Sequence, residues 1–153
     1  MTIKGKALGI DYGDRRIGIA VSDIGQDVVF VRDYVENTSR PEVIQKIKDL
    51  CDQDQISLVV VGLPLNMEGN DTDQTRKVRL FVEDLKQAIG MEIVLHDERL
   101  TAVRSGVILT SIGVKGEDRK ERKDAIEASL ILQNYLDLLG KSQGNKKGDN
   151  HIQ

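Results

Sequence analysis

Acidic residues at the ends of apolar segments are the groups in this chain most capable of chemistry. Asp11 ends a glycine-rich apolar segment, Glu98 follows a second apolar segment, and Asp124 lies in the first turn of a predicted helix. Carboxylates brought together repel one another unless a cation or a proton lies between them, and oxygen-only ligands suit Mg²⁺ or Mn²⁺. Two such ions can stabilise the attacking and leaving oxygens of a phosphodiester displacement. These residues are therefore candidate catalytic metal ligands, provided the fold brings them together.

Two further acids lie beside these candidates. Asp97 directly precedes Glu98, and it could support a ligand by hydrogen bonding or cap a following helix; we favour Glu98 as the ligand. Glu127 is three residues after Asp124, and it is either an additional ligand or a solvated residue. Each single acid also has a plain structural interpretation, because an aspartate often forms a turn or stabilises a helix N-terminus.

Four basic residues flank the acidic ones in the sequence. Arg15 and Arg16 follow Asp11 closely, and Arg99 follows Glu98. Lys123 ends a charged stretch at 115–123 that has five basic and three acidic residues. Guanidinium groups bind phosphate through paired hydrogen bonds, so we expect these residues to contact a nucleic-acid backbone. Solvated turn residues are the competing interpretation.

The spacing of apolar residues predicts the elements that must position these side chains. Alternating apolar and polar residues indicate half-buried strands, and continuous runs of β-branched residues indicate fully buried strands. Apolar residues that recur every three to four positions indicate helices. The predicted strands lie at 6–11, 17–22, 28–35, 57–64 and 91–99. Four helices are predicted. The first begins at Pro41 and the second follows a capping-box-like pair at Asp71 and Gln74, and the other two cover 101–111 and 122–139. A mobile charged loop is predicted at 113–123, and a disordered polar tail at 140–153.

This order of elements predicts an α/β fold of one domain over residues 1–139. Its mixed five-stranded sheet has a three-stranded antiparallel part and two parallel strands, flanked by helices on both faces. In the first hairpin, one face carries bulky residues and the other is nearly bare. The bare face consists of Ala7, Gly9, Asp11, Gly18, Ala20 and Ser22. A helix can approach such a face closely, and the last helix carries small residues at Ala125 and Ala128 as well as Asp124.

Composition excludes several classes of protein. The chain has 153 residues, a formal net charge of −3, 3% aromatic residues and one cysteine. The acidic balance argues against a general nucleic-acid coat protein. A single cysteine fits a reducing compartment, and the sequence contains neither a membrane-length apolar run nor a signal-peptide core. We therefore expect a cytoplasmic protein that does not associate with membranes.

Four stretches of the sequence resemble the YqgF family, also called RuvX-like. They are LGIDYGDRRIGIAVSD, VVVGLPLNMEG, DERLTA and KDAIEASLILQNYL; they occur in the family's order and cover residues 7 to about 139. The resemblance implies an RNase H-like fold and metal-dependent phosphodiester hydrolysis, with acidic residues matching Asp11, Glu98 and Asp124. It also implies a role in maturing the 5′ end of pre-16S rRNA during ribosome biogenesis. Two positions depart from the family pattern: Glu127 stands where an alanine is usual, and Ala102 where a threonine is usual.

Two alternative functions remain open from the sequence. The same family resemblance also fits a Holliday junction resolvase acting on branched DNA in recombination and repair. The hairpin IDYG…GIAVSD additionally resembles the phosphate-binding hairpin of sugar kinases and actin-like ATPases, which would make the chain a single-lobe nucleotide-binding protein. No aromatic platform for bases is evident, so the sequence does not separate RNA from DNA, or an endonuclease from an exonuclease. Partners could include the small-subunit precursor, and the chain could be a monomer or a homodimer.

Overall fold

A single five-stranded mixed sheet organises the protein. The computed structural model describes residues 5–99 and 123–139. The strands run in the order β3-β2-β1-β4-β5; β1 pairs antiparallel with β2 and parallel with β4. The β2–β3 pair is antiparallel and the β4–β5 pair is parallel, which confirms the predicted mixed sheet. The elements are β1 (Lys6–Tyr12), β2 (Arg16–Ser22), β3 (Val29–Glu36), α1 (Arg40–Gln53), β4 (Ile56–Leu63), α2 (Asp73–Ala88), β5 (Glu92–Asp97) and a C-terminal helix at 123–139.

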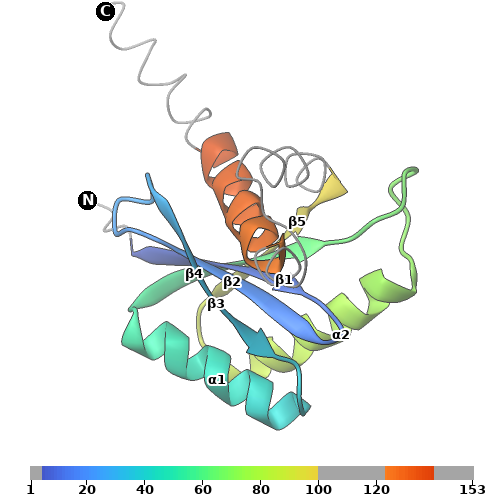
Figure 1. The fold of residues 1–153 in the computed structure, drawn as a ribbon, viewed down its shortest axis with the longest axis horizontal. Coiled ribbons are helices and arrows are strands. Elements are labelled where there is room, and N and C mark those ends of the chain that lie inside the picture. The colour runs from blue at the N-terminus through green and yellow to red at the C-terminus, as the bar shows by residue number, and fades with distance from the viewer. Residues whose placement is uncertain (1–4, 100–122, 140–153) are drawn as a thin grey trace, which may run out of the picture.

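Helices cover both faces of the sheet. Figure 1 shows α1 and α2 on one side and the C-terminal helix, in orange, on the other. The predicted division of the hairpin into two faces is confirmed. The bulky residues Leu8, Ile10, Ile17, Ile19 and Val21 belong to the larger core beneath α1 and α2. Ala7 and Ala20 belong to a smaller core with Ala128, Ile131 and Leu132 of the C-terminal helix.

Glycines allow the main chain of the C-terminal helix to lie directly on the sheet. A Cβ atom at Gly18 would lie 2.1 Å from the backbone oxygen of Asp124. At Gly9 it would lie 2.8 Å from the backbone oxygen of Ala128 and from Cβ of Leu132. Real Cβ atoms do not approach so closely, since interiors are already packed to crystal density. The two glycines therefore set the height of the helix above β1 and β2.

The start of α2 differs from the sequence prediction by one residue. Thr72, rather than Asp71, is the N-cap, and its hydroxyl accepts a hydrogen bond from the Thr75 amide. The Thr75 hydroxyl also accepts from the Thr72 amide and donates to the carbonyl of Pro64. Asp71 does not cap the helix because both of its carboxylate oxygens accept hydrogen bonds from Arg79, at 2.8 and 3.0 Å.

Several predictions concern residues outside the described ranges. These are the short helix at 101–111, most of the charged loop at 113–123, the departure at Ala102 and the polar tail at 140–153. The predicted domain end at 139 stays a prediction for the same reason. Over residues 5–99 and 123–139, no helix is both long and apolar enough to cross a bilayer.

Candidate metal centre

Three carboxylates converge on the bare face of the hairpin. Asp11 lies near the end of β1 and pairs across the ladder with Gly18 of β2. The missing side chain at Gly18 lets the C-terminal helix bring Asp124 close, and Glu127 lies one helical turn further along. Carboxylate oxygens of Asp11, Asp124 and Glu127 all lie within 4.8 Å of one another. The Glu127 carboxylate can accept a hydrogen bond from the protonated form of Asp11, which favours that form.

The electrostatics of this cluster favour a bound cation. Burial raises the pKa of Asp11 well above its usual value, and the hydrogen bond that protonated Asp11 donates to Glu127 and the charges of Glu98, Glu127 and Asp124 raise it further. Burial and the charge of Glu127 also raise the pKa of Asp124, although Arg16 and Lys123 partly oppose this shift. Carboxylates that resist ionisation in this way gain most from a divalent ion, and oxygen-only ligands fit Mg²⁺ or Mn²⁺.

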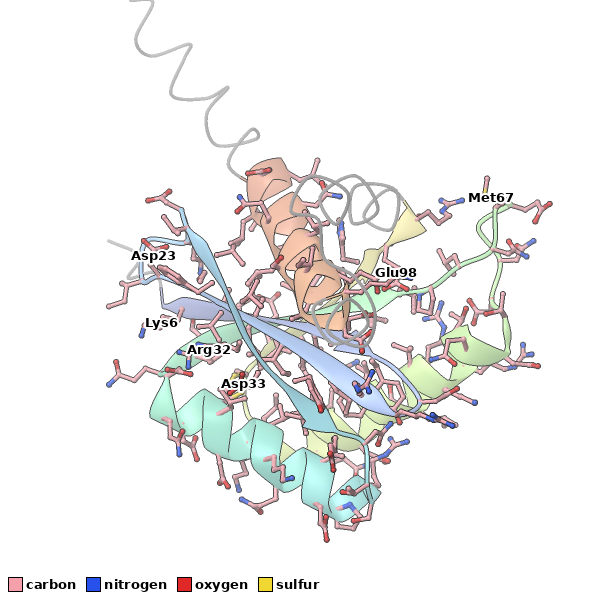
Figure 2. The ribbon with its side chains drawn as sticks, viewed as in Figure 1. Lys6, Asp23, Arg32, Asp33, Met67 and Glu98 are labelled. Carbon is pink, nitrogen blue, oxygen red and sulfur yellow. The ribbon has the colours of Figure 1, made fainter. Side chains whose placement is uncertain are left out.

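Glu98 lies at the edge of the same cluster. It follows β5, and its amide donates to the carbonyl of Leu63 at 3.3 Å. A Cβ atom at Gly62 would lie only 2.3 Å from Glu98 Oε2, so the glycine of β4 makes room for this carboxylate. Burial, followed by the charges of Glu127 and Asp97, raises the pKa of Glu98 to about 7. Figure 2 shows Glu98 between the end of β5 and the C-terminal helix.

Asp97 does not join the cluster. Its carboxylate accepts from Arg99 Nε at 2.8 and 3.0 Å and from the Arg99 amide at 3.1 Å. These hydrogen bonds are the main reason that the pKa of Asp97 is lowered. Arg99 also donates to the carbonyl of Met67 at 3.0 Å, so the pair ties the end of β5 to the loop after β4. Contact between Arg99 and nucleic acid stays a prediction.

The other predicted cations lie at different distances from the carboxylates. Lys123 Nζ is 3.9 Å from Glu127 Oε1. Arg16 is close enough to lower the pKa of Asp124, and its guanidinium lies over the ring of Tyr34, 5.4 Å from the centroid. Arg15 is exposed at the turn of the hairpin. Two of the four predicted cations therefore lie beside the acidic cluster.

Sequence reasoning left Glu127 undecided, and the structure brings its carboxylate into the cluster. The available signal was its spacing, since residues three apart lie on one face of a helix. That spacing could not show which face of the helix packs against the sheet. The small residues at Gly9, Gly18 and Ala128 determine which helix face packs on the sheet, because the backbones of the helix and the sheet come together at those positions.

Removal of divalent cations is expected to make stability fall as the pH rises. An acid whose pKa is raised on folding holds more protons in the folded state, so its contribution is present below its unfolded pKa and lost as pH rises through the folded pKa. For Glu98 this window runs from its usual 4.5 to about 7, and Asp11 and Asp124 act in the same direction. In chelator, the melting temperature should therefore be lower at about pH 8 than at about pH 5.

Two comparisons isolate this effect. Glu98→Gln should flatten the pH dependence, and Mn²⁺ should raise the melting temperature of the wild type at about pH 8 but not at about pH 5. His96 has a lowered pKa and acts in the opposite direction, but it is present in both proteins and cancels in the comparison. The prediction fails if, in chelator, the melting temperature of the wild type rises between these pH values and follows that of Glu98→Gln. That result would show that folding does not raise the pKa values of these carboxylates.

Comparison with known proteins identifies the family. The family model described as "RuvX: Holliday junction resolvase" matches residues 5–138. The chain belongs to the RuvX family. A relative from Thermoanaerobacter pseudethanolicus is 38% identical over 142 residues, which cover 92% of this chain and 99% of the relative. Another from Rickettsia conorii is 35% identical over 130 residues, covering 85% and 84%. Both carry the name "Putative pre-16S rRNA nuclease".

Two solved structures share this fold. RuvC from Thermus thermophilus aligns with a TM-score of 0.58 at 15% identity, covering 88% of this RuvX chain and 96% of RuvC. The fowlpox virus resolvase in complex with Holliday junction DNA also gives 0.58, at 10% identity, with 88% and 98% covered. At these identities the likeness establishes the fold, and it confirms the predicted RNase H-like class.

Proposed function

We propose that this RuvX protein is a metal-dependent nuclease that processes the 5′ end of pre-16S rRNA. The observation that carries the proposal is the convergence of Asp11, Asp124 and Glu127, with Glu98 at their edge, on a face that the hairpin keeps bare. The name shared by the relatives supports the choice of rRNA as substrate. The cytoplasm, where ribosomes assemble and Cys51 stays reduced, is the compartment that fits this role.

The acidic residues of the site would bind the cation, and the basic residues would bind the substrate. Asp11, Asp124 and Glu127 would hold one or two divalent ions, Mg²⁺ or Mn²⁺, and Glu98 would complete the ligand set. Bound ions supply a water of lowered pKa and stabilise the charge that develops on the attacking and leaving oxygens. Arg16 and Lys123 lie where they can hold a phosphate against the cluster. The close packing of the C-terminal helix on Gly18 keeps the carboxylates at fixed separations.

Cleavage of a Holliday junction is the second candidate. The description of the RuvX family and the resolvases with the same fold favour it. A resolvase must cut two strands in a coordinated way, so this function requires a homodimer with paired sites. Processing of a single 5′ end can be done by a monomer acting on the small-subunit precursor.

A panel of substrates tests the proposal. The protein is incubated with 5′-extended 16S precursor, a four-way DNA junction or ATP, in Mn²⁺ or in chelator. We expect cleavage of the precursor in Mn²⁺ alone, with the junction cut more slowly or not at all. Preferential cutting of the junction would support the second candidate, whereas ATP hydrolysis without cleavage of either nucleic acid would overturn both.

A further inference from the structure

An open hollow lies on the β2–β3 side of the hairpin, and one of its lining residues, Arg16, also acts on Asp124 of the metal centre. It has a volume of about 300 Å³ and is lined by Arg15, Arg16 and Tyr34, and by Glu36, Asn37 and Thr38 at the end of β3. The Asn37 amide donates to the carbonyl of Arg15 at 2.9 Å, and the Asn37 side chain donates to the carbonyl of Gly13 at 2.9 Å. These bonds tie the hairpin turn to the end of β3, so the hollow is already formed without a ligand.

A register shift places Tyr34 next to the metal centre. In the β2–β3 ladder Ile17 pairs with Val35 and Ile19 pairs with Arg32, so two residues of β3, one of them Tyr34, lie opposite Gly18. Gly18 in turn pairs with Asp11. Because adjacent strands are about 4.8 Å apart, the backbones of Tyr34 and Asp11 are separated by roughly two strand spacings. The Arg16 guanidinium lies over the Tyr34 ring, 5.4 Å from its centroid, and its charge also lowers the pKa of Asp124.

We propose that this hollow binds an unpaired nucleotide adjoining the phosphate that is cleaved. The base stacks on Tyr34, and Arg15 and Arg16 hold the phosphate between the base and the metal centre. This inference rests on the proposed nuclease function and narrows its substrate to a strand that is single-stranded at the cleavage site. Aromatic rings combined with arginine are the usual means of binding single strands, because every base has a face that can stack, whereas a base within a duplex is already stacked on its neighbours.

The acidic residues of the hollow are compatible with this ligand. Asp14, also in its lining, forms an ion pair with Lys77 at 3.2 Å, which offsets its charge. Glu36 lies opposite Arg16 in the β2–β3 ladder, so an acidic and a basic residue are neighbours at this end of the hollow. Carboxylate and amide oxygens at the end of β3 can accept hydrogen bonds from the amino group of a base. Because Lys77 offsets the charge of Asp14, the guanidinium groups of Arg15 and Arg16 give the hollow cations that can bind a phosphate.

Binding of labelled oligonucleotides tests this inference directly. A single-stranded RNA of about 12 nucleotides, within the site sizes of known single-strand binders, is compared with a duplex of the same sequence. Fluorescence anisotropy is recorded in Ca²⁺, with the RNA checked on a gel for integrity, and 2-aminopurine in the strand reports base stacking. The proteins are the wild type, Tyr34→Ala, Tyr34→Phe and the control Phe30→Ala. Phe30 is an exposed aromatic residue of the same strand, paired with Val21, whose side chain belongs to the core beneath α1 and α2.

Tyr34→Ala should weaken binding of the single strand about tenfold or more and abolish the 2-aminopurine quenching, with duplex binding unchanged. Tyr34→Phe and Phe30→Ala should match the wild type. Equal binding of the single strand by Tyr34→Ala and Phe30→Ala would overturn the inference, as would equal losses for single strand and duplex, or no single-strand binding by the wild type.

A parallel cleavage assay in Mn²⁺ separates this inference from the function on which it rests. Cleavage by the wild type, together with unchanged single-strand binding by Tyr34→Ala, would leave the nuclease standing and remove the nucleotide site. Tyr34-dependent binding without any cleavage would keep the nucleotide site and remove the proposed nuclease function. Melting curves confirm that each variant is folded before its binding is interpreted.

Discussion

Asp11→Asn is expected to lower metal-dependent cleavage by on the order of 10³-fold, because each 1.36 kcal/mol of lost transition-state stabilisation is a factor of ten and a bound metal ion supplies several kcal/mol. Asn keeps the shape of the side chain but removes the charge at the centre of the cluster. In chelator, the same variant should melt at a higher temperature than the wild type, since Asp11 is buried beside three other carboxylates. Single-turnover cleavage in Mn²⁺ and thermal melting measure the two effects on the same samples.

Asp14→Asn is the matched control for this experiment. Asp14 is an acid of the same hairpin turn, but its side chain is 63% exposed and pairs with Lys77 rather than with the carboxylates. We expect it to retain wild-type cleavage and nearly wild-type stability, because exposed ion pairs contribute about 0–1 kcal/mol. If Asp11→Asn cleaves as fast as Asp14→Asn, the carboxylate cluster is not the active site.

Gly18→Ala is expected to separate the C-terminal helix from the sheet and so to damage stability and cleavage together. The added methyl group would meet the backbone of Asp124 at 2.1 Å, and a backbone oxygen cannot move aside as a flexible side chain can. Overpacking of this kind costs about 1–3 kcal/mol, which corresponds to a fall in melting temperature of roughly 3–10 °C for a domain of this size. Asp124 and Glu127 lie on the displaced helix, so binding of Mn²⁺ should weaken as well.

Gly90→Ala is the control that shows whether the lower stability of Gly18→Ala comes from its contact with the helix or from replacing a glycine as such. Gly90 is exposed, and a Cβ atom there would have nothing within 4 Å. We therefore expect a melting temperature and a Mn²⁺ affinity close to those of the wild type. The account of helix docking fails if Gly18→Ala is as stable as Gly90→Ala, or if it loses stability while binding Mn²⁺ normally.

Strand alternation made much of this fold predictable from sequence. The bulky and bare faces of the hairpin could be assigned because side chains point alternately to opposite sides of a strand. A bare face requires a close neighbour, and the last helix was the segment that carried small residues and an acid together. The mixed sheet and the approach of Asp124 to Asp11 follow from these two observations.

The parts that could not be predicted depend on contacts between distant side chains. Asp71 and Thr72 are both good helix caps, and only the position of Arg79 decides between them. Asp97 and Glu98 are adjacent acids, and the pairing of Asp97 with Arg99 separates their roles. Tyr34 gave no signal at all in the sequence, because its proximity to the carboxylates arises from a register shift in the β2–β3 ladder.

Binding of Mn²⁺, measured by isothermal titration calorimetry at about pH 8, tests the central claim most directly, because metal affinity is independent of the substrate chosen. The wild type should bind at least one ion saturably and release protons as it does so, since burial and the neighbouring carboxylates raise the pKa of Asp11 well above its usual value. Asp11→Asn and Glu127→Ala should each bind much more weakly, and Asp14→Asn should bind as the wild type does. Equal affinity in Asp11→Asn and the wild type, or no binding by the wild type, would contradict a metal centre at these carboxylates.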